Sequence, residues 1–89
     1  MMLRGYTKKI KILDGDGYIY QFDNGYGASV VQHSGSYGGK QGLYEIAVLD
    51  SGGDLCYSTP ITEDVIGYAD EDKVLDTLQR IKLLWISFT

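Results

Sequence analysis

Cysteine, long apolar runs and proline are all scarce in this sequence of 89 residues. Cys56 is its only cysteine, which excludes an intramolecular disulfide and is typical of a reducing compartment. No apolar run approaches the ~20 residues of a membrane span, and the N-terminus lacks the apolar stretch of a signal peptide. We therefore expect an intracellular, cytoplasmic protein with no membrane partner.

Basic residues are also few. Eight Lys and Arg residues against twelve Asp and Glu residues give a formal net charge of −4. Nucleic-acid binding draws its affinity from clustered basic charge, and the one cluster here is Lys8, Lys9 and Lys11. In an alternating strand Lys9 and Lys11 share a face, which favours the solvated side of an edge strand. The acidic balance suits a basic protein partner, or plain solubility, better than nucleic acid.

The length and composition indicate one domain spanning residues 1–89. Hydrophobic residues make up 44% of the chain and charged residues 22%, an ordinary balance for a folded protein. A chain of this length is too short to bury two separate cores. With one proline and twelve glycines, glycine must supply most of the turns, which favours hairpins.

Five segments have the pattern of β-strands. Residues 8–13 alternate polar and apolar side chains, and Tyr18, Tyr20 and Phe22 would share one face of the next segment. Asn24-Gly25 is the strongest hairpin signal, because a type I′ turn needs positive φ at both central positions. The expected strands are residues 8–13, 18–22, 28–33, 43–49 (nearly all apolar, which favours a central position) and 55–59, the last ending at Pro60.

A single helix is predicted near the C-terminus. Asp70 is a suitable N-cap, and the carboxylates that follow it favour the positive end of the helix dipole. An apolar stripe continues the pattern through Val74, Leu75, Leu78, Ile81 and Leu84. Residues 61–69 show no clear pattern, with Val65, Ile66 and Tyr68 expected in the core. The prediction is an α+β fold: an antiparallel meander of about five strands with one C-terminal helix packed on one face.

The glycine-rich stretch HSGSYGGKQG, residues 33–42, raises the question of phosphate binding. A P-loop requires glycine where this chain has Ser34, and Ser or Thr where it has Gln41. It must also open a helix, whereas a strand is expected from Leu43. Three requirements fail, so we expect no nucleotide.

The sequence offers few residues at the spacings that metal binding or catalysis requires. An EF-hand loop starting at Asp14 would place Tyr18, Ile19 and Gly25 at positions that need an oxygen ligand, glycine and glutamate. The single histidine, His33, and the single thiol, Cys56, fall on strands that flank a third, so they are not expected to form a nucleophile–base pair. The adjacent carboxylates at residues 63–64 are expected by chance among twelve acidic residues. We expect a non-enzymatic protein without a metal or another cofactor.

Tyrosine is abundant, with eight copies, and a small core cannot enclose them all with their hydroxyl groups satisfied. Tyr37 stands among glycines, and it either folds over the sheet as a lid or is a contact residue together with Lys40. The predicted binding loop comprises Tyr37, Lys40, His33, Gly38 and Gly39.

The block from Phe22 to Ile81 resembles a small family of proteins from tailed-bacteriophage genomes. The resemblance rests on FDNGYGASVVQHSGSYGGKQGLYEIAVLD, on LCYSTPITEDVIGY and on a helix that ends LQRIKLL. The family has no known activity, so the resemblance carries over no catalytic residues and implies only expression inside an infected bacterium. The N-terminal strand and the apolar tail, residues 85–89, lie outside the matching block.

Two functions follow from these patterns. The first is an accessory protein that binds a host or phage protein through residues 34–42 and exposed tyrosines, and modulates host processes or defence. The alternative is a self-associating structural module, a homodimer through a sheet edge or through the tail residues Trp85, Ile86 and Phe88.

Overall fold

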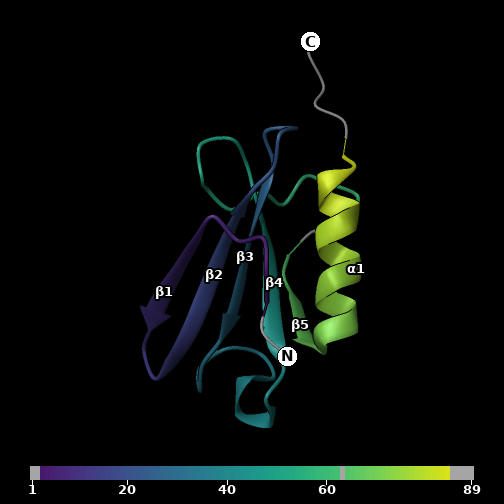
Figure 1. The fold of residues 1–89 in the computed structure, drawn as a ribbon. Helices are drawn as coiled ribbons and strands as arrows, with labels where there is room; N and C mark the ends of the chain where they lie inside the picture. The colour runs from purple at the N-terminus through teal and green to yellow at the C-terminus, as the bar shows by residue number, and fades with distance from the viewer. Residues whose placement is uncertain (1–2, 63, 85–89) are drawn as a thin grey trace.

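A computed structural model describes residues 3–62 and 64–84 of the chain (Figure 1). It contains one five-stranded antiparallel sheet in the order β1-β2-β3-β4-β5, with a helix, α1, packed beside it. The elements are β1 (Lys8–Ile12), β2 (Gly15–Gln21), β3 (Gly27–Gln32), the 3-10 helix η1 (Gly39–Gln41), β4 (Tyr44–Leu49), β5 (Ile66–Ala69) and α1 (Glu71–Lys82). The predicted meander with one C-terminal helix is confirmed, and β1 is an edge strand.

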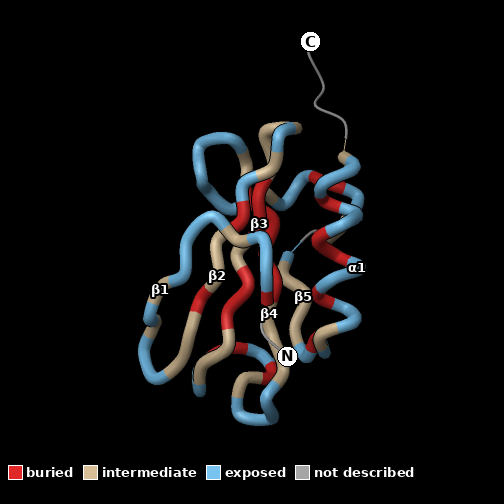
Figure 2. Tube along the Cα trace, viewed as in Figure 1, coloured by how far each residue is buried: buried red, intermediate tan, exposed pale blue. Residues whose placement is uncertain are grey.

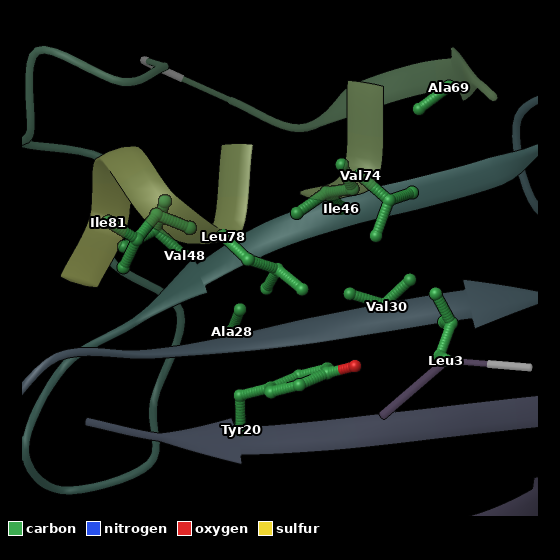
Figure 3. Close-up of a cluster of buried hydrophobic side chains, with 10 residues drawn as sticks. All are labelled: Leu3, Tyr20, Ala28, Val30, Ile46, Val48, Ala69, Val74, Leu78 and Ile81. Atoms are coloured by element: carbon green, nitrogen blue, oxygen red, sulfur yellow. The ribbon is translucent and has the colours of Figure 1, made fainter. Parts of the chain in front are cut away.

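The core lies between α1 and one face of the sheet, which we call the helix face. The register places Tyr20 opposite Ala28 and Ala28 opposite Val48, so these side chains share that face. The buried cluster consists of Leu3, Tyr20, Ala28, Val30, Ile46, Val48, Ala69, Val74, Leu78 and Ile81 (Figure 3). Figure 2 shows the same pattern along the chain, with burial concentrated on β3, β4 and the sheet-facing side of α1. In the described part of the chain, no helix covers the opposite face, the open face.

The segment before β1 covers the part of the helix face that α1 does not reach. Leu3 is only 3% exposed and lies in the core cluster. The Tyr6 ring lies 5.2 Å from the Tyr18 ring and 6.4 Å from the Tyr20 ring, measured between centroids. The Tyr20 hydroxyl donates to the Arg4 carbonyl at 3.0 Å, and burial raises the pKa of that hydroxyl. The N-terminal segment is therefore part of the core.

The two ends of α1 are capped by side chains. The Asp70 carboxylate accepts a hydrogen bond from the Lys73 amide at 2.8 Å, which confirms the predicted N-cap. At the other end the Asn24 side-chain amide lies 2.9, 3.1 and 2.9 Å from the carbonyl oxygens of Ile81, Lys82 and Leu84. The Ile81 carbonyl also accepts from the Leu84 amide at 3.1 Å, and through these contacts Asn24 ties the β2–β3 turn to the helix C-terminus.

The apolar stripe on α1 is mostly as predicted. Val74, Leu78 and Ile81 are buried, whereas Leu75 is 47% exposed because it lies next to the stripe. Thr77 takes the remaining buried position, and it is completely shielded from solvent.

Replacing Thr77 with valine is expected to stabilise the protein by about 1 kcal/mol. The Thr77 hydroxyl oxygen is buried with no hydrogen-bond partner among the described residues, and valine has nearly the same shape without the polar atom. Urea unfolding followed by circular dichroism would measure the change. Reduced stability would show instead that the hydroxyl is satisfied, for example by an ordered water.

The predicted fifth strand at residues 55–59 is wrong. Leu55 forms one isolated bridge with Leu49, and the Cys56 amide donates to the Val48 carbonyl at 2.8 Å. Beyond that point the chain leaves the ladder, because Cys56 and Ile61 pack against the core cluster instead.

The fifth strand is β5, in the region that showed no sequence pattern. A register shift interrupts its pairing between Tyr44 and Ile46, and Tyr68 has a positive φ of 53°. These irregularities remove the alternation that sequence analysis detects. Ile66 packs against the core as expected, whereas Tyr68, predicted to be a core residue, is 59% exposed.

Two turns also differ from expectation. β2 begins at Gly15 and not at residue 18, so the first turn is formed by Leu13 and Asp14. At the second turn Gly25 has a φ of 90°, but Asn24 has no positive φ, so the predicted type I′ turn is wrong. The Gly25 amide donates to the Phe22 carbonyl at 3.1 Å in a longer loop. This loop aims the Asn24 side chain at α1.

Candidate functional site

Three connections meet at one end of the sheet, which we call the loop end. They are the β1–β2 turn at residues 13–14, the β3–β4 loop at residues 33–43, and the end of β5 with its junction to α1, at residues 67–70 (Figure 1). In an antiparallel meander the first and third connections lie at the same end, and β5 also ends there. The predicted binding loop is therefore joined by two neighbours from distant parts of the sequence.

The β3–β4 loop is folded around Ser36 and His33. The Ser36 hydroxyl donates to the His33 carbonyl at 2.8 Å and accepts from the His33 amide at 3.0 Å. The Gly35 amide donates to His33 Nδ1 at 3.0 Å. One ring nitrogen of His33 thus serves as an acceptor within the turn, and the loop backbone is fixed by its own side chains.

The loop is also attached to its neighbours. The Ser34 amide donates to the Asp14 carboxylate at 2.8 Å, and the Tyr37 amide donates to the Glu45 carboxylate at 2.9 Å. The hydrogen bond from Ser34 holds the pKa of Asp14 below its usual value of 3.8. Because the folded-state pKa is lowered, this attachment is fully present above the usual pKa and is lost as the pH falls through the lowered value.

The glycines of the loop allow close backbone contacts. A Cβ atom on Gly39 would lie 1.8 Å from the His33 carbonyl oxygen. Gly38 is buried with a φ of 89°, and a Cβ there would lie 2.8 Å from Tyr68 Cα. Gly67 of β5 likewise leaves room for the Cβ of Tyr37, which would otherwise be 2.5 Å away. These glycines are required by packing of the loop against itself and against β5.

Three large hydrophobic side chains are exposed at the loop end. Leu13 is 79% exposed, Tyr37 is 61% exposed and Tyr68 is 59% exposed. The Tyr68 amide donates to the Tyr37 carbonyl at 3.1 Å, so the two tyrosines are neighbours in space. Among the described residues other than glycine, Leu13 and Tyr68 are the two with positive φ, 55° and 53°. Backbone strain of this kind concentrates at functional sites.

Lys40 is exposed between two shallow hollows. One, of ≈ 390 Å³, is lined by Asp14, Asp16 and His33, and the other, of ≈ 240 Å³, is lined by Tyr37 and Tyr68. Lys40 lines both. The loop end thus offers aromatic surface on one side of Lys40 and carboxylates on the other, with Leu13 exposed on the β1–β2 turn.

The structure brings the predicted residues His33, Tyr37 and Lys40 together. Sequence analysis missed Leu13 and assigned Tyr68 to the core, since neither carried a signal of exposure. His33 follows β3 at the loop end, whereas Cys56 pairs beside Val48 at the other end of β4, so they are not brought together. The predicted interface residues Trp85, Ile86 and Phe88 lie outside the described residues.

A larger hollow of ≈ 690 Å³ lies on the open face, between the β2–β3 turn and the turn at residues 50–54. Its lining combines Ile19 and Leu49 with polar groups such as Lys8 and Asp50. The Asp50 carboxylate already accepts from the amides of Gly52 and Asp54, at 2.9 and 3.0 Å. None of the predicted site residues lies there.

No group of three or more His, Cys, Asp or Glu side chains in residues 3–62 and 64–84 is arranged to hold a metal ion. No helix in the same residues is long and apolar enough to cross a membrane.

Comparison of the chain with models of protein families, with curated proteins and with solved structures gives no match.

Proposed function

We propose that this protein is a non-enzymatic accessory protein that binds another protein through the loop end. The observation that carries the proposal is the adjacent exposed pair Tyr37 and Tyr68, which lines one hollow together with Lys40 beside a hydrogen-bonded loop, with Leu13 also exposed on the β1–β2 turn. Together with the resemblance to phage proteins, it supports a host or phage protein as the partner, bound in the cytoplasm of an infected bacterium to modulate host processes or defence.

The exposed side chains at the loop end are of types that are common in protein interfaces. Tyrosine supplies a large contact area with few rotatable bonds, and residues of this type carry much of the binding energy in interfaces. The loop backbone is already fixed by Ser36, Asp14 and Glu45, so little conformational entropy is lost on binding. The positive charge of Lys40 would attract a carboxylate of the partner and so help to fix the relative position of the two surfaces.

The distribution of reactive groups supports the non-enzymatic part of the proposal. Cys56 and His33 lie at opposite ends of the sheet, and His33 Nδ1 accepts from the Gly35 amide. A nucleophile and its base need direct hydrogen-bond contact. The loop end supplies contact surface without such a pair.

Replacing Tyr37 and Lys40 together with alanine is expected to weaken partner binding by about a hundredfold or more, because two central contacts are lost. Both side chains are exposed, so the melting temperature should change little. The assay is affinity capture from bacterial lysate, followed by titration of the captured protein. Tyr57→Ala is the matched control, because Tyr57 is 48% exposed and lies outside the loop end.

Capture by the wild type and by Tyr57→Ala, but not by the double variant, would support the proposal. Equal capture by all three would contradict the assignment to the loop end. Capture lost in Tyr57→Ala alone would move the binding surface to the segment after β4.

A further inference from the structure

The two edges of the sheet differ in how freely they can pair with another strand. At β5 the neighbouring loop lies against the strand: the Tyr68 amide donates to the Tyr37 carbonyl at 3.1 Å, and Tyr37 packs over Gly67. A register shift also interrupts β5. At the other edge, β1 is five residues long, and no strand in the described part of the chain lies beyond it (Figure 1). β1 is therefore the edge open to pairing.

The outward backbone groups of β1 can be assigned from its turn. Ile12 and Gly15 close a two-residue turn, so they form a hydrogen-bonded pair. Hydrogen-bonded and non-hydrogen-bonded pairs alternate along an antiparallel ladder, so Lys8 and Ile10 also point their amides toward β2. The amides of Lys9 and Lys11 then point outward and are available to a new strand.

The side chains of β1 present different chemistry on the two faces. Lys9 and Lys11 lie on the helix face, where Lys9 Nζ is 5.5 Å from the centre of the Tyr18 ring. Lys11 Nζ lies 3.2 Å from the Asp16 carboxylate, but the lysine side chain is 84% exposed, so the pair is weak. On the open face Ile10 lies across from Gly17 and Ile12 is half-buried.

A strand added beside β1 meets Lys9 and Lys11 on the helix face, and Ile10 and Ile12 with Lys8 at the far end on the open face. We propose that the edge of β1 binds an extended segment of another protein in which acidic and apolar residues alternate. Its backbone would pair with the outward groups of Lys9 and Lys11, its carboxylates would lie beside the lysines, and its apolar residues beside Ile10 and Ile12. This surface runs along β1 and adjoins the loop end at Leu13, but the proposal does not depend on the function proposed for the loop end.

The positive charge of the lysines on β1 favours pairing with an acidic segment over pairing with a second copy of the chain. Antiparallel pairing of two β1 strands centred on Ile10 places Lys9 of one copy opposite Lys11 of the other. Like charges directly opposite each other destabilise a strand pair. The carboxylates of an acidic strand would instead attract the ammonium groups of these lysines.

The test uses three end-blocked, fluorescently labelled peptides of eight residues and the full-length protein, with binding followed by fluorescence anisotropy. One peptide alternates glutamate and valine, the second alternates lysine and valine, and the third has four glutamates followed by four valines. A labelled single-stranded DNA is the fourth probe. We expect binding of the alternating acidic peptide alone. Binding of the block peptide or the lysine peptide to the same degree, binding of the DNA alone, or no binding at all would overturn the proposal.

Two variants separate backbone pairing from charge. Lys9→Ala and Lys9→Pro both remove the ammonium group, but only proline removes the outward amide, and an edge strand tolerates proline there. We expect Lys9→Pro to bind the alternating acidic peptide at least about tenfold more weakly than Lys9→Ala. Equal affinities would overturn the pairing mode.

Hydrogen exchange in the wild type provides a readout that needs no variant. The alternating acidic peptide should slow hydrogen exchange of the Lys9 and Lys11 amides. Unchanged exchange at both amides in the saturated complex would contradict the proposal. This test remains available if Lys9→Pro fails to fold. The Tyr37→Ala, Lys40→Ala double variant should bind the peptide as the wild type does. Loss of peptide binding in it would place the peptide at the loop end instead.

Discussion

Replacing Asn24 with aspartate is expected to lower the free energy of unfolding by about 3 kcal/mol at neutral pH. The Asn24 amide donates toward the carbonyls of Ile81, Lys82 and Leu84, and a carboxylate cannot donate. The new charge would also face the negative end of the α1 dipole. The substitution thus replaces an attraction with a repulsion at the point where the β2–β3 turn holds the helix.

Acid should restore part of the lost stability. The carbonyl oxygens disfavour the ionised form, so the folded-state pKa of the introduced carboxyl lies above its unfolded value of about 3.9. The contribution of this carboxyl to stability is then fully present below the unfolded value and is lost as the pH rises through the folded value. Urea unfolding at several pH values would measure this dependence. Asn24→Ala is the control, because it removes the donor without adding charge, and identical pH profiles for the two variants would contradict the electrostatic argument.

Replacing Gly39 with alanine is expected to cost about 3 kcal/mol and to disrupt the loop end. The added methyl group would lie 1.8 Å from the His33 carbonyl oxygen, and backbone atoms cannot move aside as a flexible side chain can. Relieving the overlap separates Gly39 from the turn that Ser36 holds together. Thermal unfolding would report the stability, and the chemical shifts of residues 33–43 would report the loop.

Gly42→Ala is the matched control for Gly39→Ala. Gly42 has a positive φ of 75°, but nothing lies within 4 Å of its added methyl group. It should cost only about 1 kcal/mol, from the backbone conformation alone. Equal losses in the two variants would contradict the argument that the close contact with the His33 carbonyl sets the need for glycine at residue 39.

Local signals were sufficient to predict most of the fold. Asp70 caps α1 as expected because the cap depends only on residues within one turn of it. Alternation found β1 and most of β2, because the two strands pair regularly with each other. β5 could not be found in this way, since its pairing contains a register shift and its Tyr68 has a positive φ.

The site was predicted only in part, for a similar reason. Tyr37 and Lys40 stood out because glycines surround them in the sequence. Leu13 and Tyr68 became part of the same surface because the meander brings residues 13–14 and 67–70 beside the β3–β4 loop, and no pattern within those short segments carries that information. The exposure of Tyr68 depends on its backbone conformation, which the residue type itself disfavours.

The contact between Asn24 and α1 also bears on how the protein ages. The next residue, Gly25, offers the least steric hindrance to attack of its backbone nitrogen on the side-chain carbonyl of Asn24, a reaction that expels ammonia and leaves an aspartyl residue or its isomer after hydrolysis. In the folded turn the Gly25 amide is engaged with the Phe22 carbonyl, so the reaction is confined to moments when the turn opens. Conversion of Asn24 to an aspartyl residue would therefore increase with the time that the turn spends open. The product would carry a carboxylate beside the C-terminus of α1.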